Sequence, residues 1–167
     1  MSGIVRLGVV SDTHLPHFGH VLPDPLVRAF DGVDAILHLG DFTGAEVPGL
    51  FEAIARLEAV AGNNDGPDLV RRFGRQKILT INGVRIGMIH GDAPAARIPA
   101  RLWARQAFAA ERPDLICYGH SHVPELVQDG QTLVLNPGSP TDRRRMPDFS
   151  CAVVTLRDGA ITAELHH

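Results

Sequence analysis

Two histidines separated by a single residue form the stretch of the chain best suited to metal chemistry. His120 and His122 follow an apolar run at residues 114–117, and Gly119 opens a sharp turn before them. The apolar run predicts a buried strand, so both imidazole rings stand where the backbone leaves a sheet. Two rings on one turn can face two neighbouring points, as a pair of metal ions requires. A surface loop with two unrelated histidines is the alternative.

Polar residues also follow five other apolar runs of the chain. Ligands of open α/β sheets bind beyond the carboxyl ends of the strands, so residues more than a hundred positions apart can converge there. Most of these endings lie beside a glycine or another small residue that lets the backbone turn. The residues at the six endings are Asp12, His14, Asp41, Asn63, His90, His120, His122 and Asn136.

The donor types in this set favour two divalent cations. Carboxylate, imidazole and amide oxygen suit manganese, iron or zinc, and none of the strand-end residues offers a thiolate. Two ions about 3.5 to 4 Å apart require a bridging carboxylate and can hold a hydroxide between them. Asp41 stands alone at its strand end, so we expect it to be the bridge.

The elements that must position these residues alternate between strand and helix in the first half of the chain. Apolar runs predict strands at residues 4–10, 35–39 and 58–61, and helical spacing predicts a helix over residues 44–57. A short helix should begin at Pro25, with a later helix over residues 98–110.

The second half of the chain is typical of hairpins. Asn82-Gly83, Asp129-Gly130 and Asp158-Gly159 each separate two apolar runs, which is a strong turn signal. No repeat or linker divides the sequence. We therefore expect one α/β domain over residues 1–167, in which two sheets face each other and helices cover the outer faces.

Composition excludes several classes of partner. The net charge of -3 offers no general attraction to nucleic acid or to an anionic membrane, so a small ligand is expected. No apolar stretch approaches the roughly 20 residues of a membrane helix, and no cleavable leader opens the chain, so the cytoplasm is the expected compartment. Cys117 and Cys151 lie in apolar runs and imply no disulfide.

The order of the motifs resembles that of the calcineurin-like metallophosphoesterases. The short chain and the Gly-Asn-x-Asp form resemble, more closely, the small prokaryotic phosphodiesterase group related to the retromer scaffold subunit. The resemblance implies a four-layer αββα sandwich of two mixed sheets flanked by helices. The motifs are Asp12-Thr13-His14, Gly40-Asp41, Gly62-Asn63-Asn64-Asp65, His90 and Gly119-His120-Ser121-His122.

The same resemblance implies which residues hold two divalent ions. Manganese is the expected metal, with iron, zinc or nickel as alternatives. One ion would be bound by Asp12, His14, Asp41 and His122, and the other by Asp41, Asn63, His90 and His120.

Asn64 departs from the larger family, in which many members carry a histidine thought to protonate the leaving group. An asparagine has no proton to give at neutral pH, so the chemistry should favour leaving groups such as aryl oxides, which depart as anions. His17 or His20, in the loop that follows Asp12-Thr13-His14, could supply a proton instead. The competing interpretation is that both are solvated loop residues.

Further candidates carry two interpretations each. His38 is a packed strand residue or an outer partner of the site, and Asp65 and Asp92 are turn residues or outer partners of the ligands. Residues 136–139 form an Asn-Pro-Gly-Ser turn that resembles a family loop near the metals. The arginines at 143–145 form a solvated loop or bind phosphate.

The predicted function is hydrolysis of phosphodiesters without a covalent enzyme intermediate. A hydroxide held between two metals would attack phosphorus in line. A phosphomonoesterase or nucleotide hydrolase is the first alternative, and a non-catalytic interaction scaffold is the second. The expected partner is a small phosphoester, and a homo-oligomer remains open. The catalytic set is Asp41, Asn63, Asn64, His90 and His120.

Overall fold

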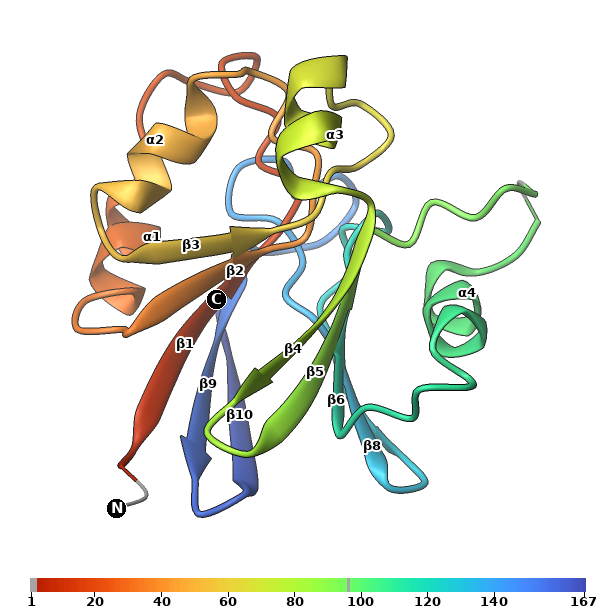
Figure 1. The fold of residues 1–167 in the computed structure, drawn as a ribbon. Coiled ribbons are helices and arrows are strands. Elements are labelled where there is room, and N and C mark those ends of the chain that lie inside the picture. The colour runs from red at the N-terminus through yellow and green to blue at the C-terminus, as the bar shows by residue number, and fades with distance from the viewer. Residues whose placement is uncertain (1–2, 96) are drawn as a thin grey trace.

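Two β-sheets face each other across the middle of the protein, and helices lie on their outer faces (Figure 1). The structure is a computed structural model that describes residues 3–95 and 97–167. Positions 1, 2 and 96 of the predicted 1–167 domain lie outside the described residues. The two mixed sheets with flanking helices confirm the predicted α/β sandwich.

The first sheet has a parallel half and an antiparallel half. The three strands that come first in the chain run parallel, because helices connect them, and the last two strands of the chain form the predicted hairpin around Asp158-Gly159. In spatial order the described strands are β10 (Ala160–His166), β9 (Cys151–Arg157), β1 (Val5–Val10), β2 (Ala35–His38) and β3 (Arg56–Ala59).

The second sheet is bounded by two hairpins. The turns at Asn82-Gly83 and Asp129-Gly130 join its antiparallel pairs, and three strands between them run parallel. In spatial order the described strands are β4 (Gln76–Ile81), β5 (Val84–Ile89), β6 (Leu115–Cys117), β8 (Thr132–Asn136) and β7 (Glu125–Asp129).

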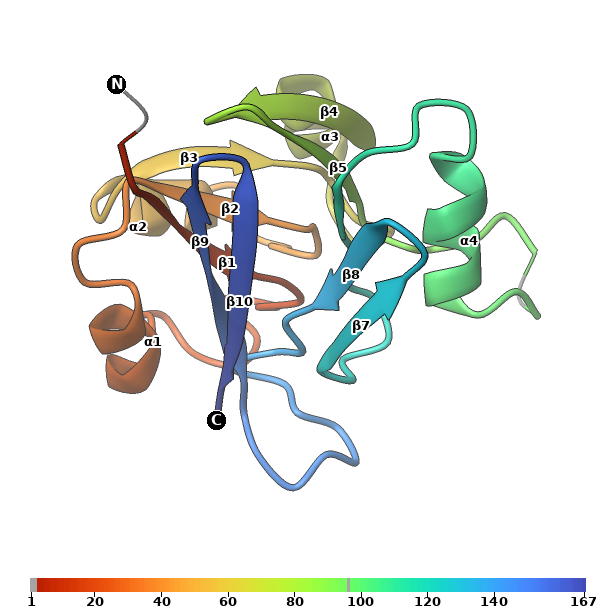
Figure 2. The ribbon, with the colours of Figure 1, turned by 90° about the horizontal axis from the view of Figure 1, so that it is seen from below.

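Alternation along the strands divides the apolar side chains among three cores. Leu7 and Val9 of β1 face the second sheet and join its Ile86, Met88 and Leu115. The next core lies between the first sheet and the helices α1 (Asp24–Ala29), α2 (Val47–Glu52) and α3 (Pro67–Phe73). The third lies between the second sheet and α4 (Ala100–Ala107) on the far side (Figure 2).

Two predicted helices are shorter than their apolar spacing suggested. The helix predicted over residues 44–57 ends at Glu52, because Arg56 and Leu57 pair with Ala35 and Ile36 as the start of β3. Parallel pairing with a buried strand therefore outweighs helical spacing there. The helix predicted over residues 98–110 occupies only Ala100–Ala107. Helix α3, which begins with Pro67, was not predicted.

Within residues 3–95 and 97–167, none of the helices is long and apolar enough to cross a membrane.

Candidate metal centre

The carboxyl ends of the parallel strands from both sheets meet at one edge of the sandwich. The Gly119 N–H donates to His90 O at 2.8 Å, and the Asp12 N–H donates to Gly40 O at 3.0 Å. These bonds hold neighbouring strand ends in register. The predicted site residues all follow strands at this edge: Asp12 and His14 follow β1, Asp41 follows β2, Asn63 and Asn64 follow β3, His90 follows β5, and His120 and His122 follow β6.

Asp12 has one satisfied carboxylate oxygen and one free oxygen. Its Oδ2 accepts hydrogen bonds from Ser11 Oγ at 2.6 Å and from the His120 N–H at 2.9 Å. Because His120 follows β6 of the other sheet, the second bond joins the two sheets through the site. Among the described residues, Oδ1 is buried without a hydrogen-bond partner. This oxygen is therefore oriented for a ligand.

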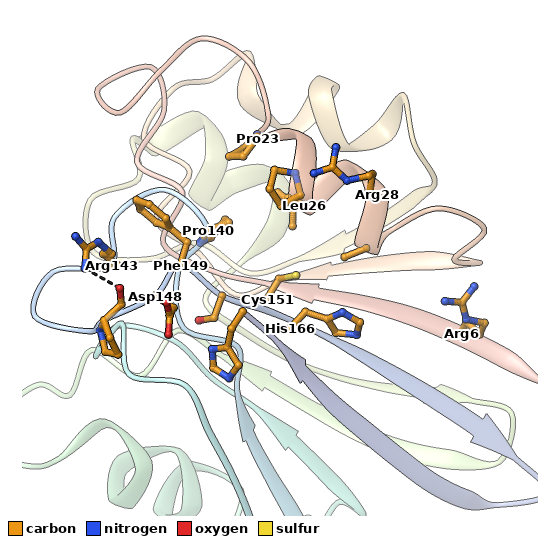
Figure 3. Close-up of a pocket in the computed structure, with 15 residues that line it drawn as sticks. Arg6, Pro23, Leu26, Arg28, Pro140, Arg143, Asp148, Phe149, Cys151 and His166 are labelled. Carbon is orange, nitrogen blue, oxygen red and sulfur yellow. Dashed lines mark hydrogen bonds between the residues drawn. The ribbon is translucent and has the colours of Figure 1, made fainter.

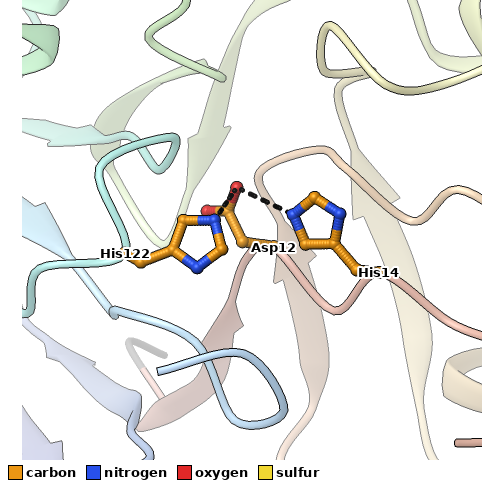
Figure 4. Close-up of side chains that lie close together, drawn as sticks. All are labelled: Asp12, His14 and His122. Carbon is orange, nitrogen blue, oxygen red and sulfur yellow. Dashed lines mark ion pairs between the residues drawn. The ribbon is translucent and has the colours of Figure 1, made fainter. Parts of the chain in front are cut away.

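Three side chains direct unpaired atoms toward one point (Figure 4). His122 Nε2 lies 3.4 Å from Asp12 Oδ1, and His14 Nε2 lies 3.9 Å from the same oxygen. All three atoms are buried and lack a hydrogen-bond partner in the part of the chain that the structure describes. Burying such atoms is costly unless something binds them, so this cluster fits a cation.

Asp41 lies beside the cluster of Asp12, His14 and His122 and also faces His90. Its Oδ2 is 3.5 Å from His14 Nε2 and 3.4 Å from His90 Nε2. Asn64 donates its backbone N–H to Asp41 Oδ1 at 2.9 Å and its side-chain amide to Oδ2 at 2.7 Å. Burial raises the pKa of Asp41, but the hydrogen bonds and charge of His90 and the Asn64 donors outweigh it and lower the pKa below its usual range.

His90 completes a second group with Asp12 and Asp41. One ligand atom from each of these residues lies within 4.8 Å of the others. Burial lowers the pKa of His90, but the Asp41 and Asp12 carboxylates raise it to about 9. The metal-free ring therefore holds a proton that a cation would replace. Asp12 belongs to both groups, so it stands between the two clusters together with Asp41.

Asn63 and His120 extend the second group toward solvent. Asn63 Oδ1 lies 3.1 Å from His90 Nε2 and 3.1 Å from His120 Nδ1. The Asn63 side chain is exposed and the His120 ring is partly buried. The structure thus brings together all seven residues that the sequence predicted as metal ligands.

Backbone carbonyls fix the orientation of two rings. His122 Nδ1 lies 2.5 Å from Asp142 O, and His90 Nδ1 lies 2.7 Å from Leu39 O. A carbonyl only accepts, so each Nδ1 carries a hydrogen, and each Nε2 faces the site, where a bound cation would take the place of any proton on it.

Most of the predicted ligand residues adopt an uncommon backbone conformation. The φ angles are positive for non-glycine residues that ordinarily avoid this region, at 56° for Asp12, 45° for His14, 60° for Asp41, 67° for His120 and 60° for His122. Such strain clusters at functional sites and persists only where the surroundings enforce it. The sharp turns aim each side chain back across the strand ends.

The surrounding candidates hold the backbone of the site. His38 is buried, its Nδ1 accepts from the Gly40 N–H at 3.1 Å, and its Nε2 lies 3.1 Å from Thr13 Oγ1. The Asp65 carboxylate accepts from the N–H groups of Asp41, Thr43 and Gly62 at 2.7 to 2.8 Å. His38 is thus packed in its strand and also holds the Gly40 backbone beside Asp41, and Asp65 orients the Asp41 backbone.

The remaining candidates lie farther from the clusters. His17 and His20 are exposed, as solvated loop residues would be, and Asp92 is partly buried near enough to influence the pKa of His120. Arg143 donates to the carbonyls of Met146 and Pro147, both at 2.8 Å, and so braces its own loop.

The Asn-Pro-Gly-Ser turn contacts the site through Ser139, whose Oγ donates to Asp12 O at 2.8 Å. Other supporting residues were missed because their roles arise only in three dimensions. Thr141 Oγ1 donates to Thr13 O at 2.6 Å, across more than a hundred residues. The Asp142 carbonyl carries no sequence signal, because every residue has one. Ser11 could have been found from its position directly before Asp12, since it is a polar residue at a buried strand end.

The fold and the site together define a class. Two mixed sheets between helices, with carboxylates, imidazoles and an amide gathered at the strand ends, are the framework of a metal-dependent hydrolase. Residues 5–159 match the family model of the calcineurin-like phosphoesterase superfamily domain. The chain therefore belongs to this superfamily of metal-dependent phosphoesterases, which act on small phosphoesters, as the resemblance implied.

Known proteins agree with this membership. A probable metallophosphoesterase of Methanocaldococcus jannaschii is 38% identical over 141 residues, which are 84% of this chain and 71% of that protein. A probable metallophosphoesterase of Methanothermobacter thermautotrophicus is 32% identical over 163 residues, 95% of this chain and 90% of that protein. A phosphodiesterase of M. jannaschii is 25% identical over 146 residues, 80% and 83% of the two chains.

The fold is shared with a crystal structure of a Vps29 mutant from Entamoeba histolytica. The TM-score is 0.76 with 22% sequence identity, and the match covers 97% of this chain and 98% of that one. At this identity the likeness concerns the fold alone.

Proposed function

We propose that the protein is a phosphodiesterase that works with two divalent metal ions. The observation that carries this proposal is the buried, unpartnered set of Asp12 Oδ1, His14 Nε2 and His122 Nε2, directly beside a second group formed around Asp41 and His90. One ion would be held by Asp12, His14, Asp41 and His122, and the other by Asp41, Asn63, His90 and His120. When bound, the ions would lower the pKa of the attacking water and offset charge on the phosphoryl group.

The protein's own groups would fix the geometry of the reaction. Asn64 restrains both oxygens of Asp41, which is the proposed bridging carboxylate. Ser11 and the His120 N–H hold Asp12 Oδ2, so that Oδ1 keeps its direction. Such positioning avoids reorganisation during the reaction, which is a large part of catalytic power.

A diester suits this site better than a monoester. Burial is the largest influence on the pKa values of His14, His90 and His120, and the charged groups that shift these values next are neighbouring histidines and carboxylates. A monoester dianion needs more cationic groups than a diester monoanion does. The sequence suggested the arginines at 143–145 as a phosphate-binding cluster. Arg143 of this cluster donates to backbone carbonyls of its own loop instead. The phosphodiesterase of M. jannaschii supports the same choice.

The leaving group should be one that departs without protonation. The Asn64 amide donates to Asp41 and has no acidic proton. Diesters with an aryl leaving group should therefore be hydrolysed, and diesters with only alkyl leaving groups should be hydrolysed far more slowly. If His17→Ala and His20→Ala leave the turnover of an alkyl diester unchanged, neither histidine supplies the proton.

The test compares a bis-aryl phosphate with the matching aryl phosphate on protein loaded with manganese, iron, zinc or nickel. We expect the diester to be preferred and manganese to activate most strongly. Asp41→Asn should lower turnover by at least about 10²- to 10³-fold while circular dichroism stays unchanged. Preference for the monoester, or activity retained in Asp41→Asn, would overturn the proposal. Absence of activity on either ester with every metal would favour the scaffold alternative.

We further propose that residues 1–167 act as one domain in the cytoplasm. The core shared by the two sheets supports the first part, because Leu7, Val9, Ile86 and Met88 pack together between them.

A further inference from the structure

A second concave site lies away from the metal ligands. It is a cavity of about 770 Å³ between α1 and the segment that precedes β9 (Figure 3). None of the seven predicted metal ligands lines it. Its volume falls within the range of roughly 300 to 1,000 Å³ that is typical of small-molecule sites.

The wall of the cavity is largely apolar. Leu26 of α1 is buried at its base, Pro23 and Pro140 line the sides, and the free thiol of Cys151 adds a small apolar surface. The Phe149 side chain is 50% exposed although it lines the cavity. The Arg143 guanidinium lies 5.6 Å from the centroid of the Phe149 ring, so an apolar and a cationic group meet at this wall.

Three arginines surround this apolar wall. The side chains of Arg6 and Arg143 donate to backbone carbonyls, and Arg28 is exposed at the end of α1. In the part of the chain that the structure describes, no carboxylate forms an ion pair with any of the three guanidinium groups. Asp148 is the single acidic residue of the lining, so the cavity carries an excess of positive charge.

We propose that this cavity binds a small amphipathic anion, with its apolar part against Leu26 and Phe149 and its carboxylate or phosphate toward Arg28 and Arg143. A guanidinium group donates to either anion through paired N–H groups. An apolar chain or ring would cover the Phe149 side chain. A cation or a neutral molecule of the same size would leave the arginines without a counter-charge.

The bound anion also changes the affinity of the metal centre. Pro140 and Arg143 line the cavity, and the segment between them contains Asp142, whose carbonyl holds His122 Nδ1 at 2.5 Å. Thr141 in the same segment donates to Thr13 O. A ligand that orders this segment should stabilise the orientation of His122. This link rests on the metal centre proposed above, whereas binding to the cavity does not.

The binding test uses anilinonaphthalene sulfonate, a fluorescent aromatic anion, on the full chain without metal. Octanoate and octyl phosphate should displace it, and the stronger competitor shows whether a carboxylate or a phosphate is preferred. Octylamine and octanol should not displace it. Arg28→Gln should weaken probe binding by about three- to tenfold, and Arg28→Gln with Phe149→Ser should weaken it further. Arg145→Gln is the control, because Arg145 is exposed in the loop that contains Arg143 but does not line the cavity.

Equal probe affinity in the Arg28 and Arg145 variants, or equal displacement by octylamine, would overturn the binding site. The link is tested by titrating Mn²⁺ with and without saturating octanoate, which is not a phosphoester, in the wild type and in Arg28→Gln. We expect a gain in Mn²⁺ affinity of at least about twofold in the wild type and a smaller gain in the variant. Thermodynamic linkage demands that Mn²⁺ tighten octanoate binding by the same factor. An unchanged Mn²⁺ affinity would refute the link, and Mn²⁺ that fails to bind at all would instead refute the proposed function.

Discussion

Replacing Gly119 by alanine should damage the metal centre through a single added methyl group. Gly119 packs directly against the strand end that carries Asp12. A Cβ atom at this position would lie 1.9 Å from Ser11 Oγ and 2.7 Å from Asp12 Oδ2. Both contacts are far shorter than real Cβ contacts, and Ser11 and Asp12 are fully buried, so neither can swing into solvent.

The size of the effect follows from the geometry. The Ser11 contact must open from 1.9 Å to an ordinary 3.4 Å, so an atom must move by about 1.5 Å. That movement breaks the bond of 2.6 Å between Ser11 Oγ and Asp12, and a hydrogen bond to a charged acceptor contributes about 1.5 to 3 kcal/mol. We therefore expect Mn²⁺ affinity to fall by roughly 10- to 100-fold. Overpacking should lower the free energy of unfolding by about 1 to 3 kcal/mol.

The assay is a competition titration of Mn²⁺ against a chelating dye, combined with urea unfolding of the metal-free protein. Gly49→Ala is the control, because this exposed glycine of α2 has nothing within 4 Å of an added Cβ. The helix propensity of alanine should make that variant more stable by about 0.5 to 1 kcal/mol, with unchanged Mn²⁺ affinity.

A second variant separates the clash from the lost hydrogen bond. Ser11→Ala removes the hydrogen bond to Asp12 but adds no atom, so its loss of Mn²⁺ affinity should be smaller than that of Gly119→Ala. Wild-type Mn²⁺ affinity in Gly119→Ala would refute the reasoning, since it would mean that Asp12 can shift freely without harm to the site.

Three further predictions concern protons and the Asn64 amide. The Asp41 and Asp12 carboxylates outweigh burial and raise the pKa of His90 to about 9, so Mn²⁺ must displace a proton from this ring. The affinity for Mn²⁺ should therefore rise from pH 7 to 9 by up to about tenfold per pH unit. An affinity that does not change with pH would contradict this. Burial lowers the pKa of His38 well below its usual value, so the folded protein favours the neutral ring. The stability that the neutral His38 ring contributes is complete above about pH 6.5 and is lost on acidification. His38→Gln should reduce the fall in melting temperature between pH 7.5 and 5.5. Asn64→Ala should lower turnover of a bis-aryl phosphate about tenfold with little change in KM, because Asp41 loses one of its two restraints.

The sequence predicted which residues would lie close together, because strand ends converge. Six apolar runs with polar endings implied one crowded edge, and the structure places Asp12 beside His122 although 110 positions separate their numbers. Hairpin signals such as Asn82-Gly83 were equally dependable, since only a few turn types join adjacent antiparallel strands.

Other features could not be predicted from local pattern. Leu57 fits helical spacing, yet its pairing with Ile36 in the parallel sheet decides its state. Asn63 and Asn64 are neighbours of the same type, and only the structure shows that the Asn63 side chain contacts His90 and the Asn64 side chain contacts Asp41. The cavity beside α1 likewise depends on how the segment before β9 folds back.

The two sheets meet at the metal centre, and this joint has a mechanical consequence. Asp12 and Asp41 follow strands of one sheet, whereas His90 and His122 follow strands of the other, and the hydrogen bond from the His120 N–H to Asp12 crosses between them. An ion bound there would crosslink the two sheets at this edge of the sandwich, because the sheets could not separate without releasing the ion. Metal at about 100 times its dissociation constant would add about 2.7 kcal/mol to the stability of the folded chain. Depriving a cell of the metal would therefore make the protein easier to degrade as well as inactive.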